Sequence, residues 1–250
     1  MPELPEAERA RQQIERALGR RIETVDDLDT YVCRPHAPGE IASAFAGRTL
    51  TSAHRRGKFL WVETDNGEGP VLGLHLGMAG RIVIDGRPAP RNWDRFSVDF
   101  EGGGRLALRD KRRLGRAVLE PDFSHVGPDA GEIGAADFRR RVGKGTTPVK
   151  ARLLDQGQVA GIGNLLADEV LWRAKLSPRR PAGELSTTEY ARLHRHLRSA
   201  IADAIRLGGV HTGGFIEHRR RNGVCPRCKT SLERATVGGR TTYWCPAEQL

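Results

Sequence analysis

The sequence predicts an α+β protein with two main domains, the first built on an antiparallel β-sandwich and the second helical. Three observations support this prediction. Short strand-like segments fill residues 21–120, helical patterns replace them from residue 135, and three of the four cysteines gather after residue 224. The length agrees with this division, because 250 residues can form two hydrophobic cores.

The chain begins with a predicted amphipathic helix over residues 5–19, where strong helix formers surround one face of apolar or small side chains. Between residues 21 and 120 we expect short antiparallel strands, with this N-terminal helix packed against the sandwich. The strand-like segments are RIETVDDL, RTLTSAH, FLWVETD, VLGLHLGMAGRIVI, RFSVDFE, RLALRD and AVLEP, and turns are expected at DNGEGP, DGRPAP and EGGGR.

The stretch after Pro121 is rich in glycine, proline and acidic residues, which predicts a linker. Four candidate helices follow: AADFRRRVG, PVKARLLDQG, IGNLLADEVLWRA and STTEYARLHRHLRSAIADAIR. Ser186 and Glu189 have the spacing of a capping box at the start of the last one. We therefore expect a sandwich domain at 1–122, a linker at 123–134, a helical domain at 135–223 and a cysteine-flanked β-hairpin at 224–250.

The composition indicates a nucleic-acid partner. Lys and Arg outnumber Asp and Glu by 41 to 31, which gives a formal net charge of +10, and basic residues cluster at 105–116 and 219–221. No apolar run approaches the roughly 20 residues that cross a bilayer. The N-terminus has no signal-peptide core and the cysteines show no disulfide framework, so we expect a cytoplasmic protein.

The N-terminus itself is a candidate nucleophile. Removal of Met1 would expose the secondary amine of Pro2, and an α-amine has an ordinary pKa of about 7.7–8.0, well below that of lysine. Such an amine can attack C1′ of a deoxyribose, expel the base and leave an iminium that permits strand cleavage. In the alternative, Pro2 only begins a helix whose dipole Glu3 and Glu6 complement.

The segment MPELPEAER resembles the N-terminus of the formamidopyrimidine-DNA glycosylase/endonuclease VIII family. Five further segments resemble motifs of that family, in the same order: RRGKFL, LHLGMAGR, DKRRLGR, LLDQGQVAGIGNLLADE and VGGRTTYWC. The longest of them is similar to the family's helix–two-turns–helix (H2TH) motif. The resemblance implies a monomeric bacterial base excision repair enzyme, a bifunctional DNA glycosylase/AP lyase for oxidised or ring-opened bases. Its partner would be double-stranded DNA containing damaged bases or abasic sites, cut by β,δ-elimination.

The resemblance also implies roles for single residues. Pro2 would be the nucleophile, Glu3 would assist base release and sugar opening, and Lys58 would bind phosphate beside the lesion. The remaining DNA contacts implied are Met78 and Arg112, which would fill the gap left by the extruded base, and the phosphate-binding residues Lys150, Asn164 and Arg240. Leu114 stands where the family has phenylalanine, which leaves the opposite-base preference open.

The pattern Cys225-x2-Cys228-x16-Cys245-x2-Glu248 has the spacing of a structural zinc ribbon, with glutamate in the fourth position. A carboxylate can bind zinc, so we expect these four residues to hold one structural Zn²⁺. His211 or His218 are alternatives for the fourth ligand, and a metal-free hairpin is the alternative to a zinc site.

The preferred lesion stays open at this point. The segment HTGGFIEHRRRNGVCP is short, without the long loop that closes over the base in the family's 8-oxoguanine-specific members. Endonuclease VIII-like action on oxidised pyrimidines, or mainly AP-lyase action, is the close alternative. A non-catalytic binder of damaged DNA, in which Pro2 is never unmasked, is the alternative of another class.

Overall fold

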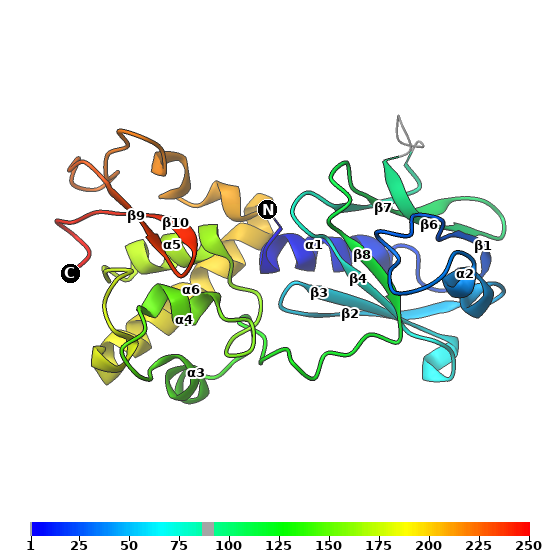
Figure 1. Cartoon of the computed structure of the whole chain (residues 1–250), viewed down its shortest axis with the longest axis horizontal. Helices are drawn as coiled ribbons and strands as arrows, with labels where there is room; N and C mark the ends of the chain where they lie inside the picture. Colours follow the sequence, from blue (N-terminus) through cyan, green and yellow to red (C-terminus); the bar gives the residue numbers. More distant parts are fainter. Residues whose placement is uncertain (1, 87–92) are drawn as a thin grey trace. The chain divides into compact units, whose positions relative to one another are not determined.

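The computed structural model describes residues 2–86 and 93–250 (Figure 1). It divides into two compact units: unit 1 contains Ala7–Phe123 with the first two residues, and unit 2 contains Glu3–Glu6 and Ser124–Leu250. The expected loss of Met1 and most of the turn expected at 85–90 lie outside the described residues.

Unit 1 is the predicted antiparallel sandwich with the N-terminal helix, α1 (Leu4–Glu15), from its fourth residue onward. One sheet has the strand order β1-β6-β7-β5 and the other β2-β3-β4-β8 (Figure 1). The strands are β1 (Ile22–Asp26), β2 (Leu50–Arg56), β3 (Phe59–Thr64), β4 (Leu72–His75), β5 (Arg81–Ile84), β6 (Asp94–Phe100), β7 (Arg105–Arg109) and β8 (Arg116–Leu119). The 3₁₀ turn η1 (Asp65–Gly67) follows β3.

Alternation along the strands builds the core of this unit. In β3, Leu60, Val62 and Thr64 are buried while the alternate residues are half-buried, as expected for one face turned to a core. Phe96 and Leu108 from the other sheet and Ile14 from α1 are buried in the same cluster. Both sheets and one face of α1 therefore share one hydrophobic core.

Two details of unit 1 differ from the sequence expectation. Residues 71–84 read as one strand-like segment, but β4 belongs to one sheet and β5 to the other, so the chain changes sheet through residues 76–80. A short helix, α2 (Glu40–Phe45), was not expected. Its first N–H groups, at Ile41 and Ala42, donate to the buried carboxylate of Asp27, a partner far away in sequence.

Unit 2 contains the four predicted helices and the C-terminal hairpin (Figure 1). Its elements are α3 (Ala135–Val142), α4 (Val149–Leu154), α5 (Asn164–Arg173), η3 (Ala182–Glu184), α6 (Thr187–Leu207), η4 (Val210–Thr212), η5 (Ile216–His218), β9 (Glu233–Val237) and β10 (Arg240–Trp244). The capping box at Ser186 and Glu189 is confirmed. Within the described residues, no helix is long and apolar enough to span a bilayer.

Candidate functional site

The side chain of Glu3 caps the N-terminus of α5. This residue is fully buried, and its carboxylate accepts three backbone hydrogen bonds: Oε2 from Gly163 and Leu166, both at 3.0 Å, and Oε1 from Leu165 at 2.8 Å. A carboxylate is well suited to this place, because the first N–H groups of a helix lack intrahelical partners and carry partial positive charge. The acid next to Pro2 is therefore held in one orientation by the backbone.

Position 163 has room only for glycine. A Cβ built there would lie 2.2 Å from Cδ of Glu3 and 2.5 Å from Oε1, far inside van der Waals contact. Glu3 is also fixed from its own side of the chain, because its N–H donates to Glu6 Oε2 at 2.9 Å and the next residue, Leu4, donates to the carbonyl of Gly161 at 3.0 Å. The glycines of the GIGN segment thus allow Glu3 and Leu4 to lie in close contact with the start of α5.

A buried charge network lies behind the start of α5. Lys150 on α4 is 0 % exposed, and its Nζ is 2.6 Å from Asp168 Oδ1. The same amine donates to Asn164 Oδ1 and to Thr242 Oγ1, each at 2.7 Å. Burial lowers the pKa of Lys150, and the neighbouring carboxylate of Asp168 offsets part of this lowering. Arg219 adds a second cation, 2.7 Å from Asp168 Oδ2.

This network orients Asn164 rather than presenting Lys150 to a ligand. The amide oxygen of Asn164 is occupied by Lys150, and Nδ2 donates to the carbonyl of Thr241 at 3.0 Å. Thr241 follows Arg240, which is exposed at the start of β10. Unit 2 therefore brings Glu3, Asn164 and Arg240 to neighbouring places, whereas Lys150, expected from the resemblance to bind phosphate, is enclosed by protein atoms.

In unit 1, strand register gathers three of the predicted site loops at one end of a sheet. Phe59 pairs with His75, and His75 pairs with Arg116, so β3, β4 and β8 share one row of residues there. Lys58 immediately precedes this row in the two-residue turn between β2 and β3. The loop that carries Met78 begins directly after His75, and the loop that carries Arg112 ends directly before Arg116, so both loops adjoin this row.

The Met78 and Arg112 loops pack closely on each other. Gly77 has a φ of 58°, and a Cβ there would lie 2.3 Å from the carbonyl oxygen of Leu114, so this approach requires glycine. The buried carboxylate of Asp110 accepts the N–H groups of Arg112 at 2.9 Å and of Leu114 at 2.7 Å. Met78 is 43 % exposed and Arg112 is exposed, so both side chains are accessible at the surface of unit 1.

His75 stays neutral beside these loops. Burial, helped by the positive charge of Lys58, lowers the pKa of His75 from 6.5 to about 4. Its Nδ1 accepts the N–H of Gly77 at 3.1 Å, which requires an unprotonated nitrogen at that position. His75 therefore braces the start of the Met78 turn as a hydrogen-bond acceptor.

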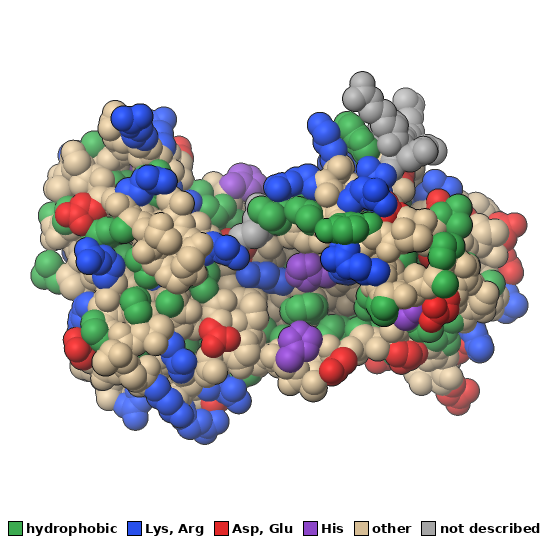
Figure 2. Space-filling view, viewed as in Figure 1, with side chains coloured by type: hydrophobic (Ala, Val, Ile, Leu, Met, Phe, Trp, Pro, Cys, Tyr) green, Lys and Arg blue, Asp and Glu red, His purple; other side chains and the backbone are tan. Residues whose placement is uncertain are grey.

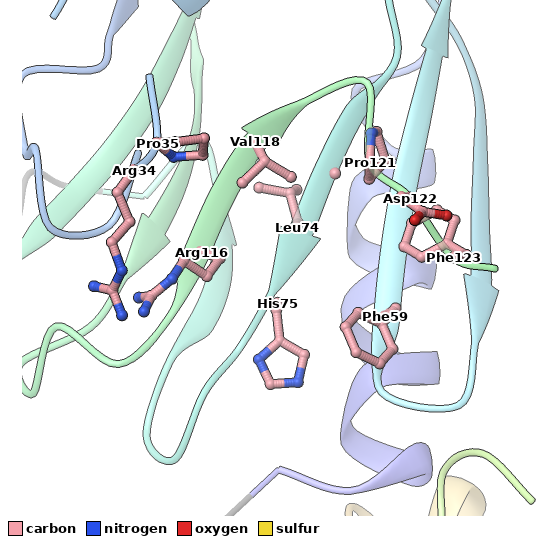
Figure 3. Close-up of a pocket in the computed structure, with 11 residues that line it drawn as sticks. Arg34, Pro35, Phe59, Leu74, His75, Arg116, Val118, Pro121, Asp122 and Phe123 are labelled. Atoms are coloured by element: carbon pink, nitrogen blue, oxygen red, sulfur yellow. The ribbon is translucent and has the colours of Figure 1, made fainter. Parts of the chain in front are cut away.

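A pocket of about 550 Å³ opens on the outer face of the β2-β3-β4-β8 sheet. One end carries the guanidinium groups of Arg34 and Arg116, and the other the rings of Phe59 and Phe123, with His75 between them (Figure 3). Basic, histidine and apolar side chains lie side by side on the face of unit 1 drawn in Figure 2. Such walls suit a flat ring attached to a negatively charged group.

The sulfur atoms of Cys225, Cys228 and Cys245 lie within 4.8 Å of one another in unit 2, in the arrangement of a metal site. The expectation that Glu248 completes this group is not met. Its Oε2 is 3.0 Å from Lys175 Nζ, and the ammonium lowers the pKa of the Glu248 carboxyl. No histidine, aspartate or glutamate among the residues that the structure describes joins the three thiols, which also leaves out both histidine alternatives.

Comparison with known proteins decides the family. A model of the formamidopyrimidine-DNA glycosylase N-terminal domain matches residues 1–117, and a model of the H2TH domain of the same enzymes matches residues 126–215. The formamidopyrimidine-DNA glycosylase of Nocardioides sp. is 35% identical over 280 residues, which cover 100% of this chain and 94% of the relative. The chain belongs to the formamidopyrimidine-DNA glycosylase family.

Other members agree in sequence and in structure. The formamidopyrimidine-DNA glycosylase of Chloroflexus aggregans is 35% identical, with 100% of this chain and 99% of the relative covered. A Lactococcus lactis Fpg in complex with DNA containing an abasic site has a TM-score of 0.86 at 28% identity, and 99% of each chain is covered. A MutM complex with DNA containing carbocyclic 8-oxo-G gives 0.86 at 29% identity over 99% of each chain.

Sequence reasoning missed the residues that hold this family's motifs in place. Asp110, Asp168 and His75 each orient a predicted site residue or loop through buried hydrogen bonds or ion pairs. Asp110 and His75 stand inside the motifs DKRRLGR and LHLGMAGR, so their position was a usable signal. Thr242 also stands inside a motif, VGGRTTYWC, but its contact with Lys150, like that of Arg219 with Asp168, depends on the approach of distant segments.

Proposed function

We propose that this chain is a bifunctional DNA glycosylase/AP lyase that removes oxidised or ring-opened bases from duplex DNA, with the amine of Pro2 as nucleophile. The observation that carries the proposal is the environment of Glu3. A fully buried carboxylate, held by three backbone N–H groups, directly follows the residue whose amine must react. The close approach at Gly163 holds this carboxylate beside the N-terminus.

The chemistry follows from the amine. Unprotonated Pro2 nitrogen attacks C1′, and the C1′–N bond to the damaged base breaks, with the bonding electrons and a proton leaving on the base. The C1′–O4′ bond then breaks, with its electrons and a proton going to O4′, while the lone pair of the proline nitrogen forms the iminium at C1′. The iminium acidifies the C2′ hydrogen, and loss of that proton expels the 3′ phosphate. Loss of a proton from C4′ then expels the 5′ phosphate in a second elimination. Glu3 is positioned to exchange protons with the sugar oxygen as the ring opens.

Several residues bind the substrate without reading its sequence. Lys58, Asn164 and Arg240 contact phosphates around the lesion, which fixes the strand in register. Lys150 acts as a positioning residue through the oxygen of Asn164. Met78 and Arg112 enter the duplex and replace the extruded base, at a cost of unstacking that is lowest for a damaged pair.

The three clustered cysteines hold a structural Zn²⁺ in the C-terminal finger. Thiolates are preferred zinc ligands, and two sulfurs bound at about 2.3 Å to one tetrahedral zinc lie about 3.8 Å apart. The sulfurs of Cys228 and Cys245 are 3.4 Å apart, close to that value. When bound, zinc supplies no redox chemistry and cross-links the hairpin that carries Arg240.

Borohydride trapping tests the nucleophile. The protein is mixed with a duplex that carries one abasic site, the iminium is reduced to a stable adduct, and peptide mapping by mass spectrometry locates the attached sugar. We expect the sugar on Pro2, with Met1 absent from the intact mass. An adduct on a lysine, or retained Met1, would refute the assignment. Exposed Lys144 offers a matched control, because Lys144→Ala should trap at the wild-type rate while Lys58→Ala traps poorly.

A lesion panel separates the substrate alternatives. Duplexes with formamidopyrimidine, an oxidised pyrimidine, 8-oxoguanine or an abasic site are compared by single-turnover rates. We expect ring-opened purines to be removed fastest, because the short segment at 211–226 lacks the loop associated with 8-oxoguanine. Faster removal of oxidised pyrimidines would support endonuclease VIII-like specificity. Tight binding with no cleavage of any duplex would support the non-catalytic alternative.

A further inference from the structure

The finger departs from a four-ligand zinc site at one turn. The motif 225–228 contributes two thiols, whereas the equivalent turn at 245–248 contributes Cys245 and ends in Glu248. The N–H of Gln249 donates to the carbonyl of Cys245 at 3.0 Å, as the N–H of Lys229 donates to the carbonyl of Cys225 at 2.9 Å in the first turn. The two turns therefore share a backbone hydrogen bond, and the second differs in carrying Glu248 where the first carries Cys228.

That side chain is engaged elsewhere. Oε2 of Glu248 is 3.0 Å from Nζ of Lys175 and 3.5 Å from Nε of Arg227. This oxygen is shielded from solvent and accepts no well-aligned hydrogen bond within the described residues, so its contacts with the two cations are ion pairs. Arg227 belongs to the first cysteine turn, and Lys175 follows the end of α5. The carboxylate thus links the two cysteine turns and α5 by charge. A metal would have to compete with two cations for it, at a cost in electrostatic energy.

Further contacts hold the second turn without a fourth metal bond. The side-chain amide of Gln249, which is 3 % exposed, accepts from the N–H of Cys245 and donates to the carbonyl of Leu176, each at 2.9 Å. The N–H of Ser177 donates to the carbonyl of Leu250 at 3.1 Å. Protein contacts therefore perform the cross-linking that a fourth ligand performs in a closed zinc ribbon.

From these contacts we infer that the finger binds its metal through the three thiolates of Cys225, Cys228 and Cys245 alone. Glu248 stays in its ion pairs, and the fourth coordination position is open to an exchangeable external ligand such as water or imidazole. This inference rests on the zinc site of the proposed function and deepens it. A closed structural zinc site has four protein ligands, so a site with three thiolates leaves one position for an external ligand.

Cobalt spectroscopy of the full chain tests the inference. Metal-free protein is reconstituted with Co²⁺, whose visible bands report the ligand set, and Zn²⁺ affinity is measured by competition with a chromophoric chelator. We compare wild type with Glu248→Gln and Glu248→Cys. The first should keep the wild-type spectrum and affinity, whereas the second should bind Zn²⁺ at least about tenfold more tightly. Imidazole should shift the bands of wild type and Glu248→Gln, and leave those of Glu248→Cys unchanged.

Two results would overturn the inference. A Glu248→Gln spectrum that differs from wild type, with affinity lowered about tenfold or more, would make Glu248 a ligand. Failure of wild type to bind Co²⁺, while Glu248→Cys binds it, would show that three thiolates do not suffice. Neither result concerns the glycosylase, because borohydride trapping on the same samples tests that activity separately.

Discussion

Replacement of Gly163 by alanine tests whether the close approach of Glu3 to α5 matters for catalysis. The added Cβ would lie 2.2 Å from Cδ of Glu3, and ordinary contact begins at 3.4 Å. The carboxylate must therefore move by about 1.2 Å, or α5 must move away from it. Either movement breaks hydrogen bonds that Glu3 accepts from Gly163, Leu165 and Leu166.

The cost follows from those bonds. Hydrogen bonds to a charged group contribute about 1.5–3 kcal/mol each, so loss of one or two lowers the free energy of unfolding by about 1.5–6 kcal/mol. For a chain of this size, each kcal/mol lowers Tm by roughly 2–4 °C. A displacement of about 1 Å at a catalytic group can cost about 100-fold in rate, and we expect Gly163→Ala to lower the rate of base excision by about that factor.

Gly134→Ala is the matched control. Gly134 is the N-cap of α3 as Gly163 is of α5, both have negative φ, and a Cβ at Gly134 would meet nothing within 4 Å. The assays are single-turnover cleavage of a lesion duplex and thermal unfolding of both variants. If Gly163→Ala cleaves and unfolds like Gly134→Ala, the carboxylate of Glu3 does not depend on this contact and our reasoning about the site fails.

Three further predictions concern other parts of the site. His75 is neutral when folded, so the unfolded state binds an extra proton between pH 4 and 6.5, and the free energy of unfolding should rise by ~3 kcal/mol across that range. Urea titrations at several pH values should show a smaller rise in His75→Asn. Lys150→Met leaves Asp168 with one fewer buried partner and should cost about 3 kcal/mol of stability; an unchanged urea midpoint would contradict this. Arg240→Ala should reduce the slope of log affinity against log salt by about 1, measured by fluorescence anisotropy, whereas Lys144→Ala should leave it unchanged.

The helices and strands were predicted from patterns that extend over only a few neighbouring residues. The amphipathic helix at the N-terminus, the short strands and the four C-terminal helices follow from side-chain periodicity and turn residues, which act over a few positions. The capping box at Ser186 is one such local signal that the structure confirms. Helix α2 was not predicted because its N-terminal N–H groups are capped by the carboxylate of Asp27, more than ten residues earlier in the chain.

The division of residues 71–84 between two sheets could not be predicted from periodicity either. In the segments that become β4 and β5, apolar side chains recur at every second position. Only the pairing of β4 with β3 and of β5 with β7 assigns the two segments to different sheets. The same pairing places Lys58, Met78 and Arg112 at one end of a sheet, although more than fifty residues separate the first from the last.

By itself, the sequence determined the fold class, the resemblance to a DNA repair family and the identity of the candidate nucleophile, because each depends on residue type and local spacing. Only the tertiary structure decided what the charged side chains do. It buried Lys150 against Asp168, turned Glu3 into the cap of α5 and paired Glu248 with Lys175. The partners of a charged side chain are the groups that lie near it in space, which only the tertiary structure shows. Once the side chain is buried it must keep such a partner, because an unpaired charge inside a protein costs much free energy.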